Sequence, residues 1–146
     1  MNIEQKTTQM KFPFSYVIYL LLASIVLHFI ATTTDIYQAQ IENDFVWFDN
    51  ILHAISGIAF GILFLWILDR KRLQYSLLTT TILTIIFVFG LAVLWEFLEL
   101  GFLKFFTSYA YNLKIYSTSI SEALFDIFSD IIGAIILLLF VRKWYK

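Results

Sequence analysis

The chain has no cysteine, a single proline and few charged side chains. The absence of cysteine excludes disulfides and thiolate metal sites, and it carries no information about the redox compartment. Charged residues make up 14% of the chain, against about 25% in a typical soluble domain. The formal net charge is -1, so the chain lacks the basic field that nucleic acid would require. We therefore expect no nucleic-acid partner.

Hydrophobic side chains take the place of the missing charges. They make up 60% of the 146 residues. The core of a chain this short cannot bury so much apolar area, because a small protein leaves much of its surface exposed. A surface that faces lipid resolves this conflict. The composition therefore predicts an integral membrane protein of the cell membrane, with membrane lipid as a partner.

Four apolar segments are long enough to cross a bilayer, which takes about 20 helical residues. The predicted spans are residues 14–33, 45–68, 77–102 and 120–141. Their apolar runs are continuous, whereas the strands of a membrane β-barrel would alternate. We interpret the first span as a retained helix because its run is long and no clear signal-peptide cleavage site follows it. The sequence predicts an all-α fold, a four-helix transmembrane bundle that forms one domain over residues 1–146.

The basic residues lie mainly in the N-terminal tail, between the second and third spans, and at the C-terminus. The connection between the first two spans has only acidic charges, which are Asp35, Glu42 and Asp44. Lys104 and Lys114, after the third span, depart from this pattern. Because cytoplasmic loops carry the excess of Lys and Arg, both termini are predicted to be cytoplasmic.

Short local patterns mark helix starts and helix contacts. Pro13 stands where the first helix should begin, a position that tolerates its missing N–H. The segment from Ser119 to Glu122 has the spacing of a capping box at the start of the fourth helix. Gly57 and Gly61 form a GxxxG pattern, which allows two helices to approach closely.

Beyond Glu122, which lies in the first turn of the last predicted span, six acidic or histidine side chains interrupt the last three predicted spans: Asp49, His53, Glu96, Glu99, Asp126 and Asp130. Each such group costs roughly 2.5–3.5 kcal/mol at the bilayer centre on insertion scales. They come in pairs three or four residues apart, so each pair shares one face of its helix. Gly57 and Gly61 continue the first of these faces, and Gly133 continues the last. We expect these faces to point into the bundle.

The six groups should occupy one layer near the extracytoplasmic end, at a rise of about 1.5 Å per residue. No Lys or Arg lies within the predicted spans to pair with them. Buried carboxylates so close together cannot all stay ionised without compensation. Bound cations, shared protons or a water-filled cavity could each provide it. His28 lies toward the same end of the first span, on one helix face with Ser24 and Thr32. These neighbours favour a hydrogen-bonded packing role for His28 over a role as a ligand.

Oxygen ligands with one imidazole suit Mg²⁺, Mn²⁺, Ca²⁺ or Zn²⁺. The sequence therefore predicts a divalent cation without identifying it. The candidate ligands are His53, Glu96, Asp126, Asp130, Asp49 and Glu99. Asp49 could equally cap its helix near the interface, and Glu99 could be solvated. Glu96, Asp126 and Asp130 are the hardest to explain without a site.

Three segments resemble the signature segments of VanZ-like membrane proteins, a superfamily named after a teicoplanin-resistance protein. They are Phe48–His53, Trp95–Glu99 and Asp126–Gly133. Asn50, Glu99 and Asp130 stand where the VanZ pattern has Lys, Gln and Asn. The resulting Glu-x-x-Glu and Asp-x-x-x-Asp versions are similar to the YjdF-like branch, uncharacterised inner-membrane proteins. The resemblance implies this architecture and site, and a role in the cell envelope or in antibiotic susceptibility.

Three kinds of function stay open on the sequence. The first is a membrane protein that binds a cation or protons. The second is a metal-dependent enzyme acting on a lipid or a lipid-linked headgroup, with Glu99 as the candidate general base. The sequence has no nucleophilic Ser or Cys motif and no Arg cluster that would bind a phosphate, and both absences argue against an enzyme. The third is a scaffold or a subunit of a membrane complex.

Overall fold

The structure is a computed structural model that describes residues 13–34, 36, 47–113 and 119–144. All the regular elements in these ranges are helical: α1 (Phe14–Thr33), α3 (Trp47–Arg70), α4 (Leu77–Phe105), α5 (Thr107–Leu113), α6 (Ile120–Val141) and the 3-10 turn η1 (Arg142–Trp144). Helices α1, α3, α4 and α6 are long and apolar enough to cross a membrane. The all-helical fold with four candidate spans is therefore confirmed, and the side on which the termini lie stays a prediction.

The connection after α4 differs from the sequence prediction. Helix α4 continues to Phe105, three residues beyond the predicted span, and then breaks at Phe106 (φ -132°, ψ 44°). The chain resumes at once as α5, whose Ala110 N–H donates to the Phe106 carbonyl. Ala110 is fully buried. Helix α3 likewise continues past the predicted residue 68, to Arg70, and the predicted start of its span at residue 45 lies outside the described residues.

Two helices begin at serine caps. The Ser119 hydroxyl accepts a hydrogen bond from the Glu122 N–H at 3.1 Å, so the predicted cap of α6 is present. The Ser76 hydroxyl accepts from the Thr79 N–H at 3.2 Å and caps α4. Each cap satisfies one of the backbone donors that a helix N-terminus leaves unpaired. Pro13 precedes α1, as predicted.

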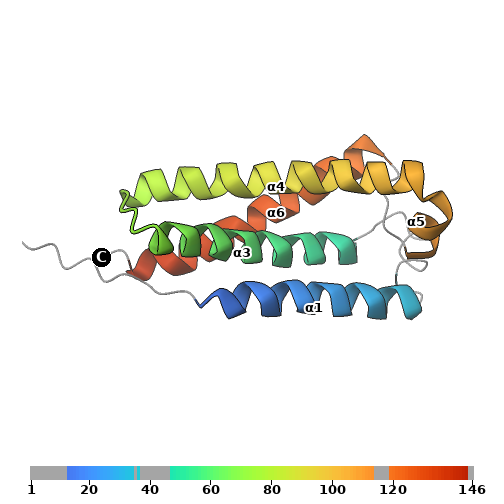
Figure 1. The fold of residues 1–146 in the computed structure, drawn as a ribbon, viewed down its shortest axis with the longest axis horizontal. Coiled ribbons are helices and arrows are strands. Elements are labelled where there is room, and N and C mark those ends of the chain that lie inside the picture. The colour runs from blue at the N-terminus through green and yellow to red at the C-terminus, as the bar shows by residue number, and fades with distance from the viewer. Residues whose placement is uncertain (1–12, 35, 37–46, 114–118, 145–146) are drawn as a thin grey trace, which may run out of the picture.

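Helix α3 lies at the centre of the bundle and packs on α1, α4 and α6, most extensively on α6 (Figure 1). At one end α3 and α6 finish and α1 and α4 start (Figure 1). We call this the basic end, because it carries Arg70, Lys71, Arg72, Arg142 and Lys143. At the other end, which we call the α5 end, α3 and α6 start and α4 finishes beside α5.

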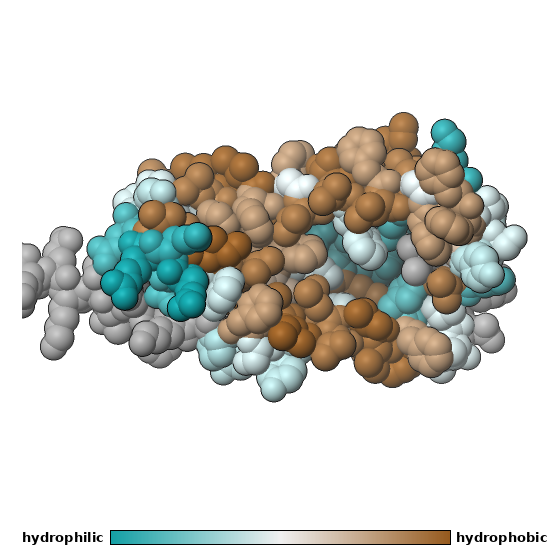
Figure 2. Space-filling model, in the orientation of Figure 1, coloured by the Kyte–Doolittle hydropathy of each residue, from teal (hydrophilic) through white to brown (hydrophobic). Residues whose placement is uncertain are grey.

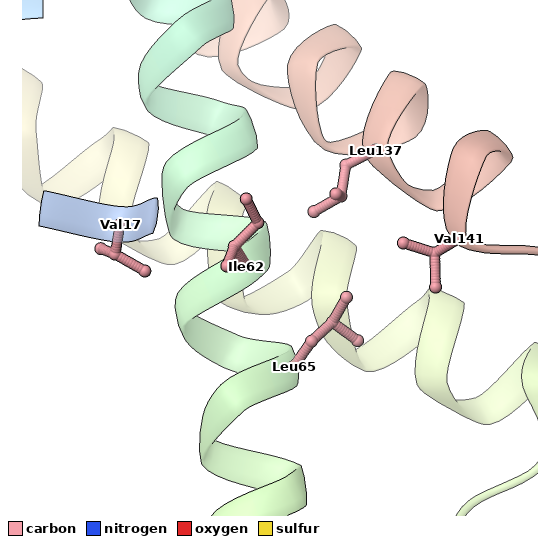
Figure 3. Packing of buried hydrophobic residues seen from close by; sticks show 5 residues of the cluster. All are labelled: Val17, Ile62, Leu65, Leu137 and Val141. Atoms are coloured by element: carbon pink, nitrogen blue, oxygen red, sulfur yellow. The ribbon is translucent and has the colours of Figure 1, made fainter. Parts of the chain in front are cut away.

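An apolar cluster joins α1, α3 and α6 in the half of the bundle toward the basic end (Figure 3). Its buried members are Val17, Ile62, Leu65, Leu137 and Val141. Many other large apolar side chains face outward from all four long helices. Figure 2 shows them as broad hydrophobic areas along the length of the bundle. Such an extensive exposed apolar surface fits contact with lipid.

Glycines bring α3 and α6 into close contact. A Cβ atom at Gly57 would collide with the backbone carbonyl of Asp130, and one at Gly133 would collide with the carbonyl of Ala54. Only residues without a side chain permit this crossing. The predicted role of the glycines in close packing is thus confirmed at Gly57 and Gly133, and the contact lies beside the polar face of each helix.

Candidate metal centre

Two helices bring a histidine and two aspartates together near the α5 end. Asp49 lies in the first turn of α3, His53 follows one turn later, and Asp126 lies near the start of α6. One ligand atom from each of the three lies within 4.8 Å of the others. His53 and Asp126 are buried, with 7% and 3% of their surface exposed, and Asp49 is half-buried. We call these three residues the Asp–His–Asp group.

Asp130 holds the imidazole of His53 from one side. The Nδ1–H of His53 donates to Oδ2 of Asp130 over 2.9 Å, because an ionised carboxylate can only accept. The other ring nitrogen, Nε2, lies 4.0 Å from Oδ1 of Asp126. At protein metal sites a histidine usually binds the metal through one ring nitrogen and donates a hydrogen bond from the other to a carboxylate. The hydrogen bond of His53 to Asp130 matches the second half of this arrangement.

A third helix, α4, adds the buried carboxylate of Glu96. Glu96 is 5% exposed, and neither of its carboxylate oxygens has a hydrogen-bond partner among the described residues. Oδ1 of Asp130 is also buried without such a partner in the described ranges. Buried polar atoms are nearly always paired, so these oxygens indicate that the layer can accept a further positive partner.

A second polar contact joins α3 and α6 beside the first. The Ser129 hydroxyl lies 2.9 Å from Oδ1 of Asn50 and 2.8 Å from the carbonyl of Phe125. The sequence reasoning did not assign a role to Ser129. The sequence did offer one indication of this contact. Ser129 is a small polar residue next to Asp130, and such residues are common where membrane helices meet.

Glu99, a predicted ligand, and His28, a predicted packing residue, both make contacts outside the Asp–His–Asp group. Glu99 is half-buried, and its Oε1 accepts a hydrogen bond from the Trp95 indole N–H at 2.7 Å. Trp95 is 44% exposed, so this pair lies at the outer surface of α4. His28 of α1 hydrogen-bonds through Nε2 to the carbonyl of Leu113, the last residue of α5, at 2.8 Å. This contact links α1 to α5 and agrees with the packing role expected for His28.

The two ends of the molecule therefore differ in charge chemistry. Hydrophilic residues gather at the basic end, at the left of Figure 2, where α3 connects to α4. Further hydrophilic residues appear in the right half of the same view, between two hydrophobic areas. Near the α5 end the buried ionisable groups are carboxylates and His53. Lys104, in the last turn of α4, is a basic side chain at this same end, whereas Arg70 ends α3 at the basic end.

Residues 5–146 match a family described as "Predicted membrane protein (DUF2238)". The chain therefore belongs to this family of membrane proteins. YjdF-like proteins are part of it, so this part of the resemblance is confirmed, and the wider VanZ-like relationship stays a prediction. Neither a curated protein nor a solved structure matches the chain.

Proposed function

We propose that this membrane protein binds a divalent cation inside the bundle, with Asp49, His53 and Asp126 as direct ligands. The observation that supports it most is the Asp–His–Asp group, whose three ligand atoms lie within 4.8 Å of one another. Bonds from Ca²⁺ to oxygen are about 2.3–2.6 Å and those from Zn²⁺ to nitrogen about 2.0–2.1 Å. One ion between atoms at this spacing can reach all three with little movement.

Asp130 and Glu96 complete the proposed site in different ways. Asp130 accepts from Nδ1 of His53, which leaves the lone pair of Nε2 for the metal. Glu96 brings a buried carboxylate from α4, and it is the candidate for a further ligand. A dication would offset part of the negative charge that these four carboxylates, including those of Asp49 and Asp126, bring into the layer.

The proposed orientation places the basic end in the cytoplasm and the metal site near the outer surface. Its support is the accumulation of Lys and Arg at the basic end. Reporter fusions after Asp69 and after Lys146 should then read cytoplasmic, and a fusion after Asn112 should read external. A cytoplasmic signal from the fusion after Asn112 would overturn the orientation and leave the cation site itself untouched.

Metal content and thermal stability of the purified full chain test the cation directly. A bound ion at a hundredfold excess over its Kd should stabilise the folded state by about 2.7 kcal/mol, and chelator should remove this gain. We expect Asp126→Asn to abolish the response to Mn²⁺, Zn²⁺, Ca²⁺ and Mg²⁺. Asp69→Asn removes the same charge at the basic end, and it should respond as the unmodified protein does.

Two results would contradict the cation. One is a melting temperature that none of the four ions and no chelator changes. The other is a metal response that Asp126→Asn and Asp69→Asn reduce equally. Stabilisation by Asp126→Asn without any metal response would instead favour shared protons, because the amide resembles the protonated acid.

A second candidate function is metal-dependent chemistry on a lipid or a lipid-linked headgroup. The observation that favours it is the position of Glu99, a half-buried carboxylate held by Trp95 at the outer surface of α4, three residues from Glu96. Glu99 would act there as general base on a substrate that reaches the site from the bilayer. Metal-dependent turnover of a lipid-linked substrate, lost in Glu99→Gln with metal binding kept, would support this role. Turnover that Glu99→Gln leaves unchanged would exclude it.

A further inference from the structure

A groove runs between α4 and α6 in the half of the bundle toward the basic end, away from the Asp–His–Asp group. Its volume is about 290 Å³. Aliphatic side chains from both helices form most of its lining, with a threonine on one wall and an arginine at one end. Its lining includes Leu78, Thr81, Ile85, Ile135, Leu139 and Arg142.

The groove begins at the basic end of the bundle, where α4 starts and α6 ends. Leu77 is the first residue of α4, and Arg142 directly follows Val141, the last residue of α6. From Leu77 to Ile85 the wall formed by α4 is about 12 Å long, at a rise of about 1.5 Å per residue. The exposed Arg142 side chain is long enough to place its guanidinium at the level of the lipid headgroups while the groove extends toward the bilayer centre.

We propose that this groove binds one anionic phospholipid, with an acyl chain along the aliphatic walls and the phosphate at Arg142. The argument is charge complementarity, since Arg142 is the charged residue in an otherwise almost apolar lining. A guanidinium recognises phosphate oxygens through paired hydrogen bonds. The other basic side chains of the connection between α3 and α4, from Arg70 to Arg72, add attraction for an anionic headgroup.

The size of the groove distinguishes this occupant from a protein partner. A packed helix with its side chains is about 10–12 Å across. A volume of about 290 Å³ lies at the lower limit of ordinary small-ligand pockets and suits a single acyl chain better than a helix. The lipid site is independent of the proposed cation site, because it uses residues from the opposite half of α4 and α6.

The test measures lipid binding to the purified full chain in detergent by native mass spectrometry. Phosphatidylglycerol and phosphatidylcholine with identical acyl chains are the two probes. We expect a several-fold preference for phosphatidylglycerol. Arg142→Gln should reduce it about fivefold, the contribution of one basic side chain near a membrane surface. Lys143→Gln removes the same charge one residue away, outside the groove lining, and should leave the preference within twofold of the unmodified protein.

Thr81→Phe fills the groove and should weaken the binding of both lipids. Each variant is first checked for an unchanged melting temperature and an unchanged response to metal. The proposal is overturned by equal affinity of the unmodified chain for the two lipids, by equal losses in Arg142→Gln and Lys143→Gln, or by undiminished binding to Thr81→Phe. A lipid-free dimer that Thr81→Phe dissociates would also overturn it, because a second copy would then occupy the groove.

Discussion

The two halves of the α3–α6 helix pair are held together by different interactions. Toward the basic end the contact is the apolar cluster, in which Ile62 and Leu65 of α3 meet Leu137 and Val141 of α6. Toward the α5 end the contact is polar, with the hydrogen bonds of His53 to Asp130 and of Ser129 to Asn50. One helix pair therefore changes from shape-dependent packing to hydrogen bonding along its length.

This difference has a physical basis in the bilayer. Lipid tails are as apolar as leucine, so apolar side chains gain little by leaving lipid, and the apolar half depends on van der Waals fit. Polar groups have no partners in the hydrocarbon, so the polar half depends on hydrogen bonds within the protein, including those between α3 and α6. Shape complementarity thus determines the helix contact in the apolar half, and hydrogen bonding determines it in the polar half.

The polar half also contains more ionisable groups than packing requires. A single hydrogen bond between small polar residues joins membrane helices, as Ser129 and Asn50 do. Carboxylates in a span are expensive, and those retained there usually mark a function. The comparison therefore supports the proposal that the polar half contains the functional site, while the apolar half and the glycine crossing chiefly stabilise the fold.

The largest effect should come from a substitution at the glycine crossing. In Gly57→Leu the new Cβ meets the Asp130 backbone, which cannot rotate away, so the helices must separate. We expect a loss of about 3 kcal/mol or more and of the metal response. Gly90→Leu adds the same side chain where nothing lies within 4 Å, and it should keep the metal response. Equal melting temperatures for the two variants would show that the close crossing is wrong.

The next effect tests whether the halves are separable. Leu137→Ala opens a cavity in the apolar cluster, where Leu137 is 6% exposed, and should cost about 2–3 kcal/mol. The Kd for metal, measured below the melting temperature, should stay unchanged. Leu124→Ala removes the same atoms from an exposed position on the same helix and should cost little. A large rise in the metal Kd of Leu137→Ala would show that the apolar half also shapes the site.

Asp130→Asn should act on the site more than on the fold. The amide keeps the shape of the side chain but weakens its hold on Nδ1 of His53. We expect the metal affinity, measured by isothermal titration calorimetry, to fall ten- to a hundredfold. Asp126→Asn, which removes a proposed direct ligand, should abolish measurable binding. If Asp130→Asn binds metal as tightly as the unmodified protein, Asp130 has no orienting role.

The smallest effect should come from the hydrogen bond between Ser129 and Asn50. A double-mutant cycle with Ser129→Ala and Asn50→Ala should give a coupling of about 0.6 kcal/mol, the average for polar pairs in membrane helices. Unfolding in mixed micelles would measure the four free energies. A coupling of several kcal/mol would mean that this pair, and not only His53 with Asp130, organises the polar half.

Local patterns predicted the elements and the faces but not every contact. The GxxxG pattern and Gly133 correctly indicated which faces of α3 and α6 meet, because small residues leave room for another backbone. Both Glu96 and Glu99 were candidate ligands on the sequence, although Glu99 could be solvated and Glu96 was harder to explain without a site. In the fold Glu96 is buried, and Glu99 is hydrogen-bonded to the exposed Trp95. A helical period fixes the angle between such residues but not which of them faces a neighbour.

Short segments were the least predictable part of the fold. The seven residues of α5 are too few to show a hydrophobic period, and the break at Phe106 has no proline or glycine to mark it. Two contacts hold this helix in place. Ala110 is buried against the bundle, and the carbonyl of Leu113 is hydrogen-bonded to His28 of α1. Contacts between distant residues, rather than local preference, place this element.

The sequence by itself determined the four apolar helices, because length and hydropathy suffice when the solvent is lipid. It also determined that acids and a histidine share one layer, since the helix rise fixes their level. Only the tertiary structure decided which atoms meet. It brought Asp126 near His53, placed Asp130 on the other ring nitrogen, and left Glu99 outside. Those outcomes depend on the rotation and stagger of whole helices, which are set by packing between segments far apart in the chain.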